Sequence, residues 1–227
     1  MTLPRTSLVR RNDTHRLIPS KYSESGESVL ARIADDDIDL NEIFDLDNAT
    51  NDRLLAENDL LSEIGIHELV FGVPNFRIVN ASFCHAHPLG GRFNTPYRGA
   101  WYAGFELKTA QAEVAFHKSV ELAEVNWLEK VEVTYDDYLA DFSAEFHDIH
   151  DDRRFAKCLA PDSYLASQEL AQRLLDAGSL GVIYPSVRRK LGKCLACFRP
   201  PLVMNVRKGA TYRFVWKGKA EPKISIA

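Results

Sequence analysis

The sequence predicts an α+β fold in which a split or bent mixed β-sheet is flanked by helices. Short apolar or alternating runs of strand length recur along the chain, and runs with helical periodicity lie between them. Most connections between them are too short for the long crossovers of a purely parallel sheet. The 227 residues, 45% of them hydrophobic and 26% charged, are enough for one sizeable core.

The first part of the chain is polar. Residues 1–15 are expected to form an irregular N-terminal arm, and residues 16–227 a single domain with an acidic helical insert at about 34–65. Seven acidic residues lie between Asp35 and Asp47, and an amphipathic run follows that Gly65 ends. The acidic run is either a solvated surface or a docking surface for a basic partner.

The central segment alternates between strand and helix patterns. Residues 75–83 alternate like a strand and stop at a Pro-Leu-Gly-Gly break. Residues 101–105 predict a short aromatic strand, after which Thr109 can cap a helix that runs to about Val125. Residues 128–134 alternate cleanly and predict the next strand.

The C-terminal segment predicts one helix and several strands. The helix covers about 162–177 and ends at Gly178, and a buried strand at Ile183 and Tyr184 is stopped by Pro185. Three further apolar runs predict strands: CLACF, LVMNV and YRFVW, at 194–198, 202–206 and 212–216.

The overall charge argues against nucleic acid as a direct partner. The formal net charge is -4 and the pI is near 6.0, so the chain has no general attraction to phosphate backbones. No apolar run has the length of a signal peptide or a membrane span, and we expect a cytoplasmic protein with no membrane contact. A basic cluster favours a rim for a phosphate ligand or a solvated edge; it comprises Arg188, Arg189, Lys190, Lys193 and Arg199.

The four cysteines are expected to be reduced thiols. Cys194 and Cys197 form a CxxC pair, which Cys84, His85 and His87 complete in principle into a zinc site. On a strand, however, this spacing directs the two sulfur atoms to opposite faces. We therefore expect no metal site.

Residues 90–119 carry the candidate chemistry, because the common nucleotide, zinc-protease and serine-hydrolase motifs are absent. Gly90-Gly91 permits a positive φ or a close approach to a ligand, and Arg92 offers a planar fork for phosphate or carboxylate. Tyr102 supplies a flat face for a heteroaromatic ring. Glu113, expected in the first turn of the following helix, can bind sugar hydroxyls and oppose a developing positive charge. Together they fit a dinucleotide with a ribose and a cationic ring.

Each of these side chains also has a purely structural interpretation. Arg92 is then a surface ion pair, Tyr102 a core aromatic residue, and Glu113 a first-turn charge favoured by the helix dipole.

Four segments in this order resemble the RES domain, a toxin family named for its Arg, Glu and Ser residues. The segments are GGRFN, WYAGF, AQAEVAFH and LGVIYPSVR. The matching residues are Arg92, Glu113 and Ser186, with Tyr102 between the first two. The resemblance extends from Arg16 to Phe198.

The resemblance implies an ADP-ribosyltransferase-like fold and a toxin of a type II toxin-antitoxin system. Such a toxin takes NAD⁺ as its substrate and cleaves the nicotinamide N-glycosidic bond, so that NAD is depleted and growth stops. It also implies a hetero-oligomeric complex in which a cognate Xre-like helix-turn-helix antitoxin covers the active site. In a glycohydrolase, water accepts the ADP-ribosyl group. In a phosphorylase, phosphate accepts it as a co-substrate. No true cofactor and no metal ion is required.

Roles for individual residues follow from this chemistry. Glu113 is expected to stabilise an oxocarbenium-like ribose, Arg92 to hold the diphosphate or orient the ribose, and Tyr102 to stack on nicotinamide or its ribose. Further residues are expected to bind the substrate or to fix the loop that binds it: Ser186, Arg16, Asn94 and Arg188.

Two alternatives remain open at this point. An ADP-ribosyltransferase modifies a macromolecular target by the same bond cleavage. A non-catalytic binding module uses Gly90-Gly91 and the aromatic strand as a partner groove.

Overall fold

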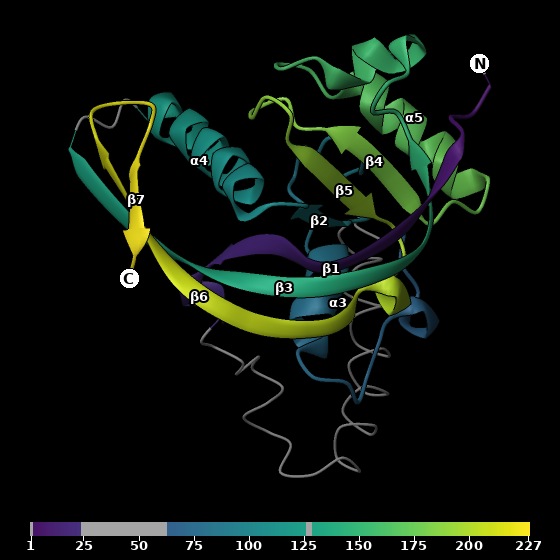
Figure 1. The fold of residues 1–227 in the computed structure, drawn as a ribbon, viewed down its shortest axis with the longest axis horizontal. Helices are drawn as coiled ribbons and strands as arrows, with labels where there is room; N and C mark the ends of the chain where they lie inside the picture. The colour runs from purple at the N-terminus through teal and green to yellow at the C-terminus, as the bar shows by residue number, and fades with distance from the viewer. Residues whose placement is uncertain (1, 24–62, 126–128) are drawn as a thin grey trace, which may run out of the picture.

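The computed structural model describes residues 2–23, 63–125 and 129–227, which form a mixed α+β structure around one bent sheet (Figure 1). The strand order is β1-β2-β5-β4-β3-β6-β7, and β1 also pairs with β3, so that five of the strands form a closed circuit. The β3–β4 pair is parallel and the other pairs are antiparallel, which confirms the predicted mixed sheet. The strands are β1 (Thr6–Pro19), β2 (Trp101–Gly104), β3 (Lys130–Asp148), β4 (Gly181–Pro185), β5 (Lys193–Cys197), β6 (Met204–Lys217) and β7 (Lys223–Ile226).

Strand β1 corrects the prediction of an irregular arm over residues 1–15. It pairs with β3 from Thr6, opposite His147, to Pro19, opposite Tyr135, with one irregularity between Arg11 and Thr14. The segment looked irregular because most of its side chains are polar, and the four residues 10–13 in its middle are all exposed. Strand β3, more than a hundred residues away in sequence, provides hydrogen-bond partners for the backbone N–H and C=O groups of β1. This pairing does not depend on the side chains of β1.

Helix α3 (Phe76–Cys84) stands where a strand was predicted, so that prediction was wrong. The apolar residues of FRIVNASF fit both the two-residue period of a strand and the period of a helix. Val79 and Phe83, four residues apart, are both buried, and this spacing is the helical one. The Asn80 side chain then both donates to the Val70 carbonyl at 2.8 Å and accepts from the Val70 N–H at 3.1 Å.

The other helices confirm the predicted elements with shifted ends. Helix α4 (Leu107–Glu124) begins two residues before Thr109, with Glu106 at its N-cap, so Glu113 lies in the second turn and not in the first. Helix α5 (Leu165–Asp176) begins later than predicted. Short helices complete the described part: α1 (Ser20–Ser23), η2 (Ile66–Glu68), η3 (Arg153–Leu159) and η4 (Pro200–Leu202).

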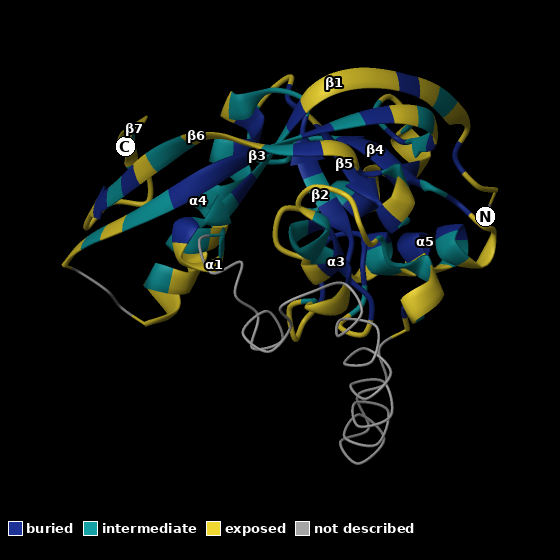
Figure 2. Cartoon of the chain, turned by 90° about the horizontal axis from the view of Figure 1, so that it is seen from below, coloured by how far each residue is buried: buried dark blue, intermediate teal, exposed yellow. Residues whose placement is uncertain are grey.

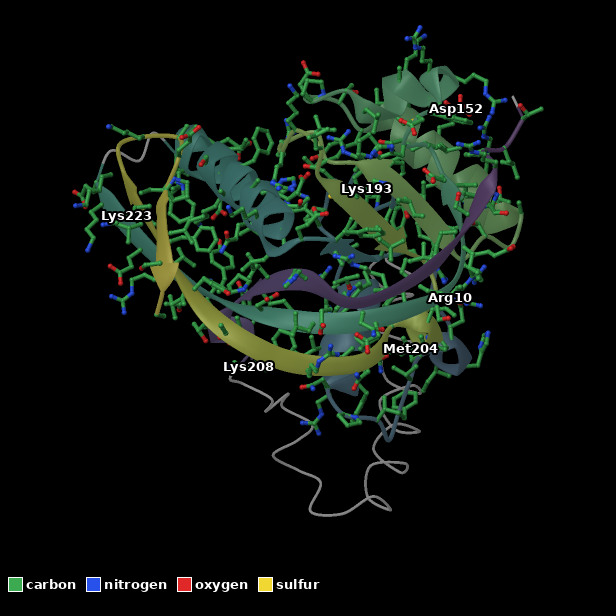
Figure 3. The ribbon with its side chains drawn as sticks, in the orientation of Figure 1. Arg10, Asp152, Lys193, Met204, Lys208 and Lys223 are labelled. Atoms are coloured by element: carbon green, nitrogen blue, oxygen red, sulfur yellow. The ribbon has the colours of Figure 1, made fainter. Side chains whose placement is uncertain are left out.

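The other predicted strands are present, although two of them are longer. Strand β3 continues to Asp148, well beyond residue 134, and β6 joins the two apolar runs LVMNV and YRFVW. In Figure 3, Met204 marks the start of β6, Lys208 lies further along the same strand, and Lys223 marks the start of β7 on the opposite side of the molecule from Met204. Of the acidic insert at 34–65, residues 34–62 lie outside the described residues.

The core consists of three apolar clusters. Figure 2 shows buried residues in dark blue on the strands and on the helices that pack against them. One cluster contains Trp101 and the buried residues of α3, a second contains Tyr184 and those of α5, and a third packs α4 against β1, β3 and β6. Trp101 and Tyr102 are neighbours on β2 and point into different clusters. This alternation directs Tyr102 to the same face as Tyr184 and Cys194.

Candidate active site

The Arg92 side chain is buried and is fixed by main-chain carbonyls. It is 7% exposed, and its Nη1 donates to the carbonyls of Cys158 at 3.1 Å and Ala160 at 2.8 Å. The guanidinium lies over the Tyr164 ring, 4.7 Å from the centroid. Within residues 2–23, 63–125 and 129–227 no carboxylate pairs with Arg92, and neither Nη2 nor Nε has a hydrogen-bond partner. The predicted alternative of a surface ion pair is therefore wrong.

The Tyr102 hydroxyl anchors the loop that carries Arg92. It accepts a hydrogen bond from the Phe93 N–H at 2.8 Å and donates one to Asn94 Oδ1 at 2.8 Å. Burial raises the pKa of the Tyr102 phenol well above its usual value, so the hydroxyl keeps its proton. Asn94 thus contacts Tyr102 within the loop, and its expected role in binding the substrate stays a prediction.

Both glycines before Arg92 are required by the shape of this loop. Gly90 has a φ of +70°, which glycine adopts without strain. A Cβ atom on Gly91 would come within 2.3 Å of Asn94 Oδ1 and 2.9 Å of the Tyr102 hydroxyl. The close approach at Gly91 is therefore to the protein's own side chains.

Glu113 and Ser186 meet across the sheet although 73 positions separate them in sequence. The Ser186 hydroxyl donates to Glu113 Oε1 at 2.6 Å, and the Cys194 thiol lies 3.8 Å from the same oxygen. Ser186 Oγ also accepts from the backbone N–H groups of Arg188 at 3.1 Å and Arg189 at 2.9 Å. A hydroxyl has one proton and two lone pairs, so Ser186 has no bonding capacity left for a ligand.

The buried Tyr184 phenol connects the two charged groups electrostatically. Burial raises its pKa well above the usual value, with further contributions from Cys194 and Glu113, and the positive charge of Arg92 opposes the shift. Its ring packs against Phe93 with centroids 4.7 Å apart. Glu113 and Arg92 therefore both influence the ionisation of Tyr184, in opposite directions.

A comparison with protein families supplies the assignment. The sequence pattern described as the RES domain matches residues 69–217, which is more than half of the chain and includes Arg92, Tyr102, Glu113 and Ser186. The chain belongs to the RES domain family. A comparison with curated proteins finds no match.

One solved structure similar to this RES domain is the crystal structure of the M. tuberculosis MbcT-MbcA toxin-antitoxin complex. The identity is 14%, the TM-score is 0.42, and the match covers 58% of this chain and 73% of that chain.

Arg188 lies at the same site of the RES domain as Glu113. Its guanidinium lies 3.3 Å from the centroid of the Phe116 ring, on the helix of Glu113, and its Nη2 donates to the Pro161 carbonyl. Its Nε is buried and has no partner, and no ion pair of the described residues involves Arg188.

Arg16 is not brought together with Glu113 and Ser186. Its guanidinium lies over the Trp101 ring, 4.9 Å from the centroid, and its Nη1 donates to the Tyr102 carbonyl at 3.2 Å. Burial lowers its pKa to about 10. The charge of Arg16 also interacts with the Tyr102 phenol, so Arg16 lies close to Tyr102 although none of its hydrogen bonds in the described part of the chain is to Glu113 or Ser186.

The cysteines lie apart, as their alternation on β5 predicts. Cys194 contacts Glu113, whereas the Cys197 thiol donates to the Arg199 carbonyl at 3.4 Å. Burial raises the pKa of both thiols, that of Cys197 to about 12. In the described ranges no three His, Cys, Asp or Glu side chains are grouped as a metal site requires, and no helix there is long and apolar enough to cross a membrane.

Several residues of this site were not predicted from the sequence. The carbonyls of Cys158 and Ala160 carry no sequence signal, because every residue has a carbonyl group. Tyr164, under the Arg92 guanidinium, becomes apparent only from this contact. The Ser-Val-Arg-Arg turn after Pro185 was the one available signal, since serine often accepts from N–H groups two and three residues ahead.

Proposed function

We propose that this RES domain is the toxin of a toxin-antitoxin pair, and that it binds NAD⁺ and cleaves the bond between nicotinamide and ribose. The observation that carries the proposal is the Glu113–Ser186 pair, in a site whose two guanidinium groups, Arg92 and Arg188, have no carboxylate partner among the described residues. Uncompensated guanidinium groups favour an anionic ligand, and a diphosphate matches their planar donors.

The proposed chemistry uses the two oxygens of Glu113 differently. Oε1 is held by Ser186, while no donor in the described part of the chain reaches Oε2. Oε2 is therefore available to the ribose, where positive charge develops as the glycosidic bond breaks. The electron pair of that bond passes to the nicotinamide nitrogen and neutralises the ring. An oxygen of water or phosphate then bonds to the ribose carbon, and water loses its proton to solvent.

Arg92 supports this reaction by binding the diphosphate. Its Nη1 is fixed by two carbonyls, and the other edge of the guanidinium has unused donors. Holding the substrate at this point positions the ribose against Glu113. Stacking of nicotinamide or its ribose on the Tyr102 ring is part of the proposal; the Tyr102 hydroxyl itself is engaged with the loop.

The deciding experiment is nicotinamide release from NAD⁺ by the purified chain without its partner, with and without phosphate. Release by the wild type and its loss in Glu113→Ala would support NAD⁺ cleavage, and a strong dependence on phosphate would identify a phosphorylase. If the folded protein releases nothing, cleavage of free NAD⁺ is rejected. Mass spectrometry of a lysate for ADP-ribose adducts then tests the transferase alternative.

The toxin role has a separate test in cells. Expression of the chain alone is expected to lower NAD and stop growth, and co-expression of a cognate antitoxin is expected to restore both. We propose an Xre-like antitoxin that covers the active site in a cytoplasmic complex. Undiminished growth with active protein present would contradict the toxin role.

A further inference from the structure

A clamp outside the candidate site joins the β4–β5 turn to the start of α4. The Arg189 Nη1 donates to Thr109 Oγ1 at 2.8 Å and to Glu106 Oε2 at 3.2 Å, and Thr109 Oγ1 donates to Glu106 Oε2 at 2.7 Å. The three side chains are therefore joined by hydrogen bonds to one another. We call the set Arg189, Glu106 and Thr109 the turn clamp.

The turn clamp and the Glu113–Ser186 bond lie on one stripe of α4. Residues 106 and 113 are seven positions apart, about two helical turns, and so lie on nearly the same face. Arg189 follows Ser186 by three residues, and its own N–H donates to Ser186 Oγ at 2.9 Å. The turn is thus attached to the helix at two points, about 10 Å apart along the axis.

The β4–β5 turn packs tightly against the first turn of α4. Thr109 is fully buried, and a Cβ atom on Gly192 would lie only 2.8 Å from its Oγ1. The turn closes on itself because the Ser186 N–H donates to the Gly192 carbonyl at 2.8 Å. The next residue, Lys193, begins β5 between α4 and α5 in Figure 3, and its carbonyl accepts from the Phe105 N–H at 2.9 Å.

Electrostatics indicates that Glu106 is needed to keep Arg189 in this place. The N-terminal end of a helix carries partial positive charge and disfavours a cation. Arg189 nevertheless lies against the first turn of α4, where the Glu106 carboxylate neutralises it. Without Glu106 the arginine would be expected to leave the helix end.

From these contacts we infer that the turn clamp is a positioning device for Glu113, which acts by holding Ser186 in hydrogen-bonding distance of the carboxylate. This inference rests on the proposed NAD⁺ cleavage. A single hydrogen bond between Ser186 and Glu113 permits the turn to pivot, whereas a second attachment two helical turns away prevents it. Arg189 is then a positioning residue that has no contact with the substrate.

The test compares Arg189→Met with Arg213→Met in nicotinamide release. Arg213 is a matched control, because its partly exposed side chain pairs with Glu132 on β3, at 3.3 Å. Arg189→Met is expected to lower kcat by about tenfold to a hundredfold, since small misplacements of a reacting group have effects of this size. KM for NAD⁺ and the melting temperature should stay near wild type, and Arg213→Met should leave kcat unchanged.

A double-mutant cycle with Glu106→Gln tests whether Arg189 and Glu106 act through the same interaction. Arg189→Met combined with Glu106→Gln should be no slower than the slower single variant, because both changes break the same clamp. Multiplying effects, an unchanged kcat, or a raised KM with normal kcat would each overturn the inference; the last would mean that Arg189 binds substrate.

Amide hydrogen exchange tests the turn clamp independently of the proposed NAD⁺ cleavage. In Arg189→Met, the amides of residues 186–192 are expected to exchange faster than in wild type and in Arg213→Met. If the wild type releases no nicotinamide but this change occurs, the cleavage proposal fails and the clamp stands. Unchanged exchange of the turn overturns the clamp whatever the activity.

Discussion

The Ser186 hydroxyl donates its only proton to Glu113 Oε1 at 2.6 Å while its lone pairs accept from the two N–H groups that follow it in the turn. The direction of this bond is thus set by the backbone of the β4–β5 turn. In the proposed reaction the second carboxylate oxygen of Glu113 then faces the ribose, and Ser186 has no donor or lone pair left for the substrate that it was expected to bind.

Glu113→Gln is expected to lower kcat for nicotinamide release by about a hundredfold to a thousandfold, with little change in KM. The amide keeps the shape of the side chain but removes the charge that opposes the oxocarbenium-like ribose. Steady-state kinetics checks this. Glu121→Gln on the same helix, where the exposed Glu121 pairs with Lys118, is the control and should behave as wild type.

Ser186→Ala is expected to lower kcat by about tenfold, less than Glu113→Gln, because the carboxylate remains but loses its orientation. It should also reduce the free energy of unfolding by about 1 kcal/mol, since two turn N–H groups lose their acceptor. Ser186→Thr retains the hydroxyl and should restore most of the rate. Equal losses in both variants would argue against the hydrogen bond as the cause.

Arg92→Lys is expected to weaken NAD⁺ binding by about tenfold or more, although the charge is kept. Lysine cannot hold two carbonyls and present a planar fork to a diphosphate at the same time. Calorimetric titration with NAD⁺ measures the affinity, and Arg213→Lys on β6 serves as the control. Unchanged affinity would remove Arg92 from the proposed binding site.

Gly91→Ala is expected to destabilise the protein by about 1–3 kcal/mol and to reduce activity, because its Cβ would collide with Asn94 and the Tyr102 hydroxyl. Gly209→Ala is a milder comparison, since the nearest atom there is 3.2 Å from the added Cβ. Denaturant unfolding ranks the two variants. The loop interpretation is rejected if both lose the same stability.

Acid stability should depend on Glu68. Hydrogen bonds from Arg98, helped by its charge and by Arg199, lower the pKa of Glu68 from 4.5 to about 2. A carboxylate whose pKa is lower in the folded state stabilises the protein above its unfolded pKa, and this contribution disappears as the pH falls through the folded pKa. Wild type should therefore lose more stability than Glu68→Gln between about pH 4.5 and 2. Urea unfolding at several pH values tests this, and parallel curves would contradict it.

The sequence by itself identified Arg92, Tyr102, Glu113 and Ser186 as candidate site residues and predicted most of the secondary structure. The ordered motifs around Arg92, Tyr102, Glu113 and Ser186 identified the family, because residue type and spacing are properties of the chain. Strand β4, ended by Pro185, and helix α5, ended before Gly178, follow from local periodicity and from residues that stop an element.

The tertiary structure decided what local patterns leave open. The polar β1 is a strand because a distant partner, β3, satisfies its backbone, and FRIVNASF is a helix because two residues four apart are buried together. The bond from Ser186 to Glu113, the carbonyls that hold Arg92, and the Trp101 ring under the Arg16 guanidinium are likewise relations between segments far apart in sequence. Such contacts depend on how elements pack and on strand register, which no short stretch of sequence specifies.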